Sequence, residues 1–83
     1  MHLHPDVVST DTDDGTVLLN QRTGRYWQLN TTGAHVLREL LAGHTPNDIA
    51  ADLAARHHID STRAEQDVTA VLTQLRTADL VTT

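Results

Sequence analysis

The side chains that could bind a metal are six histidines, four of which lie in two close pairs. His2 and His4 have a His-x-His spacing that suits zinc or nickel, and His57 and His58 are adjacent. A structural zinc site needs four ligands at finger-like spacings, often with Cys, and the chain contains no Cys. We therefore expect no metal and no cofactor. The pairs are explained by a chain terminus and by a helix C-terminus, where His interacts favourably with the helix dipole.

Candidate catalytic side chains are equally sparse. Asp13 and Asp14 are adjacent carboxylates, but they precede Gly15 in a pattern typical of a solvated turn. The chain has no glycine-rich phosphate-binding loop, and a Ser/His/Asp set has no meaning without geometry. The sequence therefore predicts that the protein is not an enzyme.

The backbone of residues 25–30, Arg-Tyr-Trp-Gln-Leu-Asn, offers chemistry of another kind. This segment holds both aromatic residues of the chain and predicts a short strand that continues into a helix. A strand at the edge of a small sheet presents free N–H and C=O groups that can pair with an extended peptide. Side chains alternate along a strand, so Trp27 and Leu29 share one face while Tyr26 and Gln28 share the other. We expect Leu29 in the core, with Trp27 partly buried beside it.

The elements around this segment divide the chain into a β-rich first third and a helical remainder. A first strand is predicted over residues 3–10, with Pro5 confining it to an edge or to loose pairing. A second strand over 17–20 follows the turn at 13–15, and the connection at 21–24 leads to the third strand over 25–29, with Gly24 available for a positive φ.

Apolar residues at helical spacing predict the first two helices. Asn30 or Thr31 caps the first helix, and Gly43 ends it. Thr45 caps the second, with Pro46 at the first helical position and Asp48 where a side chain can bond back to the cap. The buried stripes are Ala34, Leu37, Leu40 and Leu41 in the first helix, and Ile49, Ala50, Leu53 and Ala54 in the second.

The third helix, predicted over 62–77, has the most continuous apolar stripe. The pair Asp60-Ser61 caps it, and it ends near Ala78-Asp79. We expect Leu80-Val81 to fold back onto the core. The stripe consists of Ala64, Val68, Val71, Leu72 and Leu75.

Strands followed by helices indicate one α+β domain over residues 1–83, with a small three-stranded antiparallel sheet followed by three helices. This arrangement is close to a winged helix-turn-helix. Because a three-stranded sheet cannot close, its edge strands are exposed.

Charge and hydropathy limit the partners. The formal net charge of −5, with all six basic residues Arg, opposes nucleic-acid binding, and the charged residues assigned to the third helix, Arg63, Glu65, Asp67, Arg76 and Asp79, sum to −1. No apolar run is long enough to cross a membrane, and the N-terminus lacks the pattern of a signal peptide. The absence of Cys fits a cytoplasmic protein.

An ordered set of residues extends from the third strand to the third helix. It reads Gly24-x-Tyr26-Trp27-x-Leu29-Asn30-x-Thr32-Gly33, then Leu37, Leu40-Leu41-x-Gly43, Thr45-x-x-Asp48-Ile49-Ala50, Leu53, Asp67-Val68 and Leu72-x-x-Leu75. This pattern resembles the PqqD-like family. These domains are recognition elements for ribosomally made, post-translationally modified peptides. The resemblance covers about residues 15–81 and is greatest to the stand-alone recognition proteins of lasso peptide pathways.

The resemblance implies a function. Members of the family bind the leader of a precursor peptide, similar to Tyr-x-x-Pro-x-Leu in lasso pathways, as an added antiparallel strand in a groove between the third strand and the third helix. The bound precursor then passes to a leader peptidase and to an ATP-dependent lasso cyclase. The leader-binding residues implied here are Arg25, Tyr26, Trp27, Gln28 and Leu29 on the strand, and Asp67, Val68, Val71, Gln74 and Leu75 on the helix.

Several alternatives stay open. Val68, Val71 and Leu75 also belong to the apolar stripe and compete for a place in the core. A small winged-helix regulator that binds nucleic acid or another protein is an alternative function for the whole domain. A carrier for a redox-cofactor precursor is a third, since the parent family includes the chaperone of pyrroloquinoline-quinone synthesis.

Overall fold

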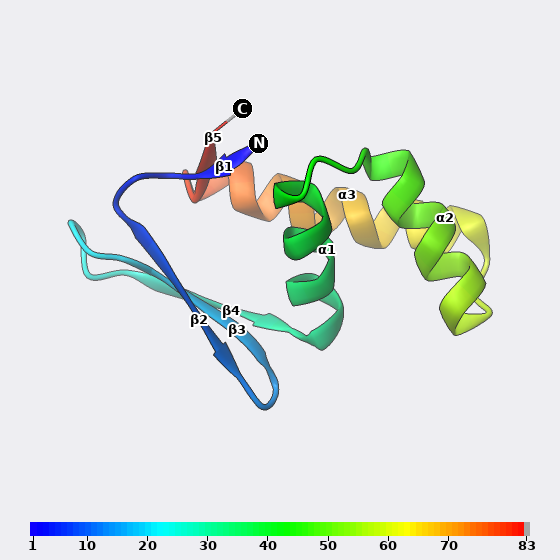
Figure 1. Ribbon diagram of the computed structural model, residues 1–83, viewed down its shortest axis with the longest axis horizontal. Helices are drawn as coiled ribbons and strands as arrows, with labels where there is room; N and C mark the ends of the chain where they lie inside the picture. Colours follow the sequence, from blue (N-terminus) through cyan, green and yellow to red (C-terminus); the bar gives the residue numbers. More distant parts are fainter. Residues whose placement is uncertain (83) are drawn as a thin grey trace.

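The computed structural model describes residues 1–82 as an α+β fold of the winged helix-turn-helix type (Figure 1). The elements, in chain order, are β1 His2–Leu3, β2 Val7–Thr12, β3 Gly15–Asn20, β4 Tyr26–Asn30, α1 Thr31–Leu41, α2 Pro46–His57, α3 Ser61–Thr77 and β5 Val81–Thr82. The order confirms the predicted fold class, and a short strand is added near each end of the chain.

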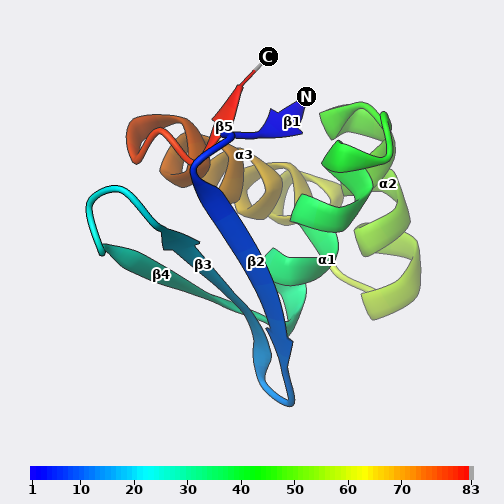
Figure 2. The same ribbon diagram turned by 60° about the vertical axis from the view of Figure 1, so that its left-hand side comes forward.

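The main sheet is antiparallel with the strand order β2-β3-β4. All three helices lie to one side of it, with α1 nearest to the strands (Figures 1 and 2). The opposite face of the sheet is left open. Because β4 pairs only with β3, it is an edge strand, as the sequence predicted.

The prediction of a single strand over residues 3–10 is wrong, because the chain turns at Pro5 and Asp6. The backbone N–H of Val7 donates to the His4 carbonyl (2.9 Å), and that of Asp6 donates to His4 Nδ1 (3.1 Å). Pro5 has no N–H and cannot continue a paired ladder. As a result β1 pairs with β5 near the other end of the chain, while β2 joins the main sheet.

Both predicted turns are present. Gly15 (φ +146°) begins β3, and Gly24 (φ +76°) lies in the β3–β4 connection. Asn20 organises that connection, because its side-chain oxygen accepts from the backbone N–H groups of Arg22 (3.0 Å) and Thr23 (3.2 Å). The third strand is shifted by one residue from its predicted bounds, so Arg25 precedes β4 and Asn30 ends it.

Side chains and glycine cap the helices where the sequence predicted. Thr45 Oγ1 accepts from the Asp48 N–H (3.2 Å), and Asp60 Oδ1 accepts from the Thr62 N–H (2.9 Å). Gly43 follows α1 with φ +97°. The expected return bond from the Asp48 side chain is not among the hydrogen bonds of residues 1–82.

The core lies between the sheet and the helices and holds nine of the thirteen predicted stripe residues. Leu41, Ala54, Val71 and Leu72 are only partly buried, while Leu80 is fully buried, as expected for a segment that folds back. Val36 was missed by the sequence analysis and is also fully buried. Since α1 contacts β3, β4, α2 and α3, it buries more of its circumference than one stripe supplies.

Within the described residues, no helix is both long and apolar enough to cross a membrane.

Gly15 and Gly24 provide a matched pair for testing the close approach of β3 to the end of β4. A Cβ on Gly15 would lie 1.9 Å from the Leu29 carbonyl oxygen, whereas a Cβ on Gly24 would meet nothing within 4 Å. We expect Gly15→Ala to lower the free energy of unfolding by about 3 kcal/mol or more, and Gly24→Ala by only about 1 kcal/mol, from its positive φ alone. Urea denaturation followed by circular dichroism measures both. Equal losses would contradict the close contact.

Candidate functional site

The backbone of β4 presents free hydrogen-bonding groups at the edge of the sheet. The Asn20 N–H donates to the Arg25 carbonyl (2.8 Å), and the register continues without a break as Leu18↔Trp27 and Val17↔Gln28. Hydrogen-bonded pairs alternate with non-hydrogen-bonded pairs in an antiparallel ladder. Trp27 therefore bonds to β3, whereas the N–H and C=O groups of Tyr26 and Gln28 point away from it. An extended chain beside β4 would meet these two residues.

The side chains of the strand alternate as predicted. Leu29 is buried in the core, and Trp27 is half-buried and packs against it. Tyr26 is 66% exposed, and Gln28 is also exposed on the same face. Arg25, just before the strand, is exposed, and its backbone N–H donates to Thr23 Oγ1 (3.3 Å).

The strand passes directly into α1 at Asn30. The Asn30 side-chain oxygen caps the helix by accepting from the Gly33 N–H (2.8 Å), which settles the choice between Asn30 and Thr31 left open by the sequence. No loop separates the edge strand from the helix. The direction of β4 is therefore tied to that of α1.

A hollow of about 260 Å³ lies between this junction and α3, and we call it the strand–helix hollow. Asn30, Thr32 and Gly33 line one side, and Asp67, Ala70 and Val71 line the other. The sequence analysis named Asp67 and Val71 as site residues, quoted Asn30, Thr32 and Gly33 as part of the motif, and did not name Ala70. Helical spacing could have found Ala70, because residues three and four apart on a helix share a face.

The remaining predicted residues of α3 lie on different sides of the helix. Val68 (1% exposed) and Leu75 (none exposed) are core residues, so they form the support of the groove rather than its surface. They face inward because they lie on the stripe that packs against the rest of the core. Gln74 is exposed, seven residues beyond Asp67 and thus on nearly the same face.

An apolar row crosses the open face of the sheet. Val8 (40% exposed), Leu19 (39%) and Tyr26 are the exposed large hydrophobic residues of the described chain. They are direct cross-strand partners, Val8↔Leu19 and Leu19↔Tyr26, and we call them the open-face row. These neighbouring side chains place exposed apolar surface on the face of the sheet opposite the helices.

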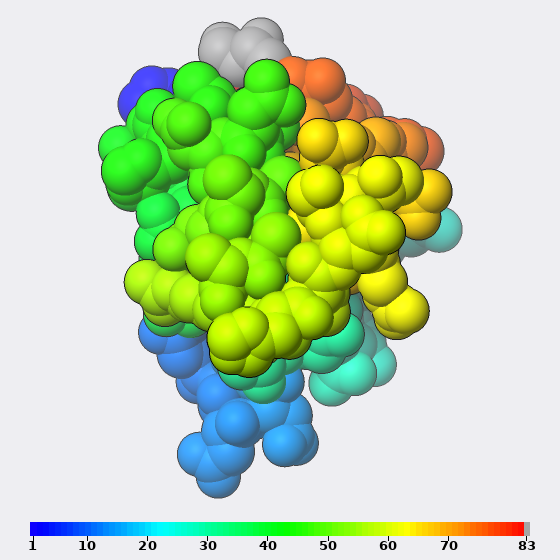
Figure 3. All heavy atoms as spheres, turned by 90° about the vertical axis from the view of Figure 1, so that its right-hand side faces the viewer, coloured from blue at the N-terminus to red at the C-terminus, as the bar shows by residue number. Residues whose placement is uncertain are grey.

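Reactive side chains do not gather in the described part of the chain. No group of three His, Cys, Asp or Glu residues within residues 1–82 could hold a metal ion. Asp13 and Asp14 are exposed in the β2–β3 turn, which projects from the molecule at the bottom of Figure 3. Asp79 lies beyond α3, so its assignment to that helix is wrong, and the charged residues within Ser61–Thr77 sum to zero.

Comparison with known proteins agrees with this geometry. Residues 15–81 match the family described as coenzyme PQQ synthesis protein D (PqqD). A lasso peptide synthetase B1 solved with the leader peptide is 40% identical, with a TM-score of 0.90 over 98% of this chain and 95% of that one. TbiB1 in complex with the TbiA(beta) leader peptide is 31% identical, with a TM-score of 0.83 over 96% of this chain and 93% of that one. No curated protein matches the chain.

Asp67 and Val68 are neighbours in sequence with different environments, and their alanine variants should separate the groove from the core. Asp67 is half-buried and forms no ion pair or side-chain hydrogen bond among residues 1–82, so Asp67→Ala should change the free energy of unfolding by less than about 0.5 kcal/mol. Val68→Ala should cost about 2 kcal/mol, because it leaves a cavity in the core. Denaturant unfolding of both variants checks this, and a large loss for Asp67→Ala would make that residue structural.

Proposed function

The chain belongs to the PqqD family, and we propose that it is a cytoplasmic, non-catalytic adaptor that binds the leader of a ribosomally synthesised precursor peptide in lasso peptide biosynthesis. Both similar structures contain a leader peptide. The observation that carries the proposal is the free edge of β4 beside the strand–helix hollow. This combination suits an extended peptide, because backbone pairing supplies affinity and a pocket supplies selectivity.

The leader adds to the sheet as an antiparallel strand alongside β4. Its backbone exchanges hydrogen bonds with the outward N–H and C=O groups of Tyr26 and Gln28. Trp27 and Leu29 hold the strand against the core, and Arg25 lies where the paired segment begins. Affinity from the main chain tolerates many leader sequences, so discrimination falls to the side chains of the groove.

The groove selects through residues of α3. Asp67 is half-buried and has no charged partner in residues 1–82, so it is placed to pair with a cationic leader side chain. Val71 offers apolar contact beside it, and Gln74 extends the same face. Val68 and Leu75 act from beneath, by holding α3 in place.

The adaptor presents the bound precursor to a leader peptidase and then to an ATP-dependent lasso cyclase. The open-face row, Val8, Leu19 and Tyr26, is where we propose the peptidase docks. Tyr26 belongs to both the binding edge and the row, so a leader on β4 and a protein on the open face would be neighbours. The peptidase would then sit beside the leader without displacing it.

A proline at Gln28 tests strand addition. The Gln28 N–H points away from β3, so Gln28→Pro removes a group that only an added strand would use. We expect this variant to lose leader binding at least about 30-fold, since one hydrogen bond is lost and the ring obstructs the edge. Fluorescence of Trp27, the only Trp, reports the titration. Gln28→Ala is the control and should bind normally. Normal binding by a folded Gln28→Pro variant would contradict strand addition.

The open-face row is tested by Val8→Ser combined with Leu19→Ser. Both side chains are exposed on the face away from the core, so the double variant should fold and bind leader with unchanged affinity. Cleavage of the precursor by the partner peptidase should fall at least about tenfold, because the apolar contact surface is lost. Ser9→Ala, on the neighbouring exposed residue of β2, is the matched control. Undiminished cleavage would place the docking surface elsewhere.

A further inference from the structure

A second hollow, of about 250 Å³, lies between α1 and the end of α2. Leu53 lines it together with Thr31, Thr32, His35, Arg38, Arg56 and His57, and we call it the basic hollow. Every titratable side chain that lines it is of a basic type. It contains two of the six Arg residues of a chain whose net charge is −5.

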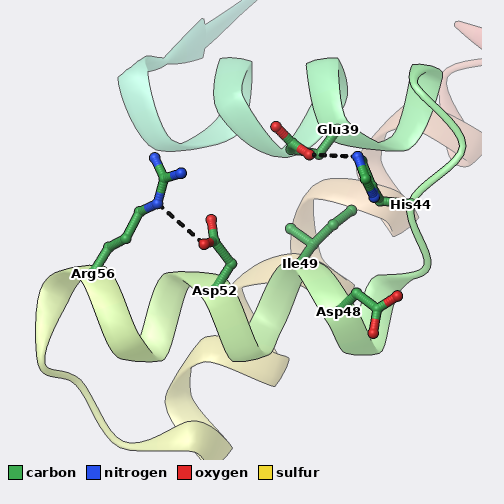
Figure 4. Close-up of a pocket in the computed structure, with 6 residues that line it drawn as sticks. All are labelled: Glu39, His44, Asp48, Ile49, Asp52 and Arg56. Atoms are coloured by element: carbon green, nitrogen blue, oxygen red, sulfur yellow. Dashed lines mark hydrogen bonds and ion pairs between the residues drawn. The ribbon is translucent and has the colours of Figure 1, made fainter.

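These basic groups are available to a ligand. Arg38 forms no ion pair among residues 1–82. Arg56 binds Asp52 through Nε alone (3.1 Å to Oδ1), and Figure 4 shows its terminal guanidinium nitrogens extending from α2 toward α1. The helix dipole explains why each Arg lies in the last turn of its helix. It does not explain why residues of two helices converge on one hollow.

Acidic side chains line a different hollow of the α1–α2 surface, although Arg56 lines both. A neighbouring hollow of about 230 Å³ is lined by Glu39, His44, Asp48, Ile49, Asp52 and Arg56 (Figure 4). Glu39 pairs there with His44 (3.2 Å), and Asp52 with Arg56, so this hollow contains its own counter-charges. In the basic hollow Arg38 forms no ion pair among residues 1–82, and Arg56 is paired only through Nε, so the basic hollow is the one that would attract an anion.

His35 adds a second observation at the wall of the basic hollow. Its Nε2 is the one buried side-chain nitrogen or oxygen in residues 1–82 without a hydrogen bond, although Asp52 Oδ2 lies at ion-pair distance from it (3.5 Å). Buried polar groups are nearly always satisfied, and an exception commonly marks a site that binds water, an ion or a ligand.

The basic hollow borders the same part of α1 as the proposed leader groove. Thr32 lines both this hollow and the strand–helix hollow. β4 runs toward Asn30, so a peptide added antiparallel to it has its N-terminal side at that end. The segment of a leader that precedes such a paired strand would therefore lie near Thr32, and the hollow that holds Arg38 and Arg56 is also lined by Thr32.

We propose that the basic hollow binds a carboxylate side chain of the leader, located N-terminal to the segment that pairs with β4. This inference rests on the proposed function. The first backbone N–H groups of α1, at Thr31 and Thr32, have no partner within the helix and add to the attraction for an anion. Such a contact distinguishes the two possible directions of the leader. Only an antiparallel leader brings acidic residues from upstream of the paired segment to the hollow.

The test is a double-mutant cycle between protein and peptide, followed by Trp27 fluorescence. The leader peptide of the precursor is compared with a peptide in which each Asp and Glu upstream of the paired segment is changed to Asn or Gln. Neutralising the peptide should weaken binding to the wild type about tenfold, and should not weaken binding to the Arg38→Gln/Arg56→Gln variant. Arg76→Gln is the control for a lost charge, because Arg76 lies nine positions, or half a helical circumference, from Asp67. Equal weakening in both proteins would overturn the proposal.

A second measurement separates this inference from the proposed function. If the leader does not bind the wild type at all, the proposed function fails, and the hollow is tested alone by adding acetate or inorganic phosphate to isotopically labelled protein. Saturable amide shifts at Thr31, Thr32 and His35 with acetate, absent in the double Arg variant, would support a carboxylate site. Shifts with phosphate alone, or with neither anion, would overturn it.

Discussion

The arrangement of this domain depends on the junction at Asn30, where an exposed edge strand becomes a buried helix without an intervening residue. The Asn30 side chain caps α1, and Gly15 allows β3 to approach the Leu29 carbonyl more closely than any side chain would permit. Gly33 is far less confined, since a Cβ there would lie 3.4 Å from both Asn30 Oδ1 and Leu29 Cβ, which is close to ordinary contact. With β4 fixed to α1, and α1 packed against α3, the edge and the groove hold one relative position.

A binding site built from an edge strand needs no reactive side chain. The chain contains no Cys, and residues 1–82 hold no metal-binding group, yet β4 presents backbone donors and acceptors of the kind that an extended peptide requires. The cost of such an edge is a tendency to pair with other chains. The exposed Gln28, just before the capped helix, keeps the edge polar, and the strand has only five residues.

Three surfaces of different chemistry meet around β4 and α1. The strand edge offers hydrogen bonds, the open-face row offers apolar contact, and the basic hollow offers positive charge. They point in different directions, because the row lies on the sheet face away from the helices while the hollow lies between α1 and α2. A peptide and a protein could therefore be bound at the same time, which is what an adaptor between a precursor and its processing enzymes requires.

Sequence reasoning failed where contacts between distant parts of the chain decided the outcome. The strand over residues 3–10 satisfied local propensity, but Pro5 ended it and the first two strand residues found a partner near the far end of the chain. Val36 was overlooked because α1 packs on more than one side. Whether Val68 and Leu75 belong to the core or to the groove was left open by the sequence, because a stripe of helical periodicity does not say which of its members retain exposed surface.

The sequence by itself determined the three helices, the two inner turns and the hairpin that ends in β4, together with their local geometry. Caps such as Asn30 and Thr45, the turn at Gly15 and the alternation along β4 follow from interactions between residues a few positions apart, which propensity and periodicity describe. Only the tertiary structure decided the surfaces. The strand order left the edge of β4 free and aligned Val8 with Tyr26, and helix packing brought Arg38 to Arg56 and Thr32 to Asp67. These are contacts between residues distant in sequence, and they are set by how whole elements pack rather than by any local pattern.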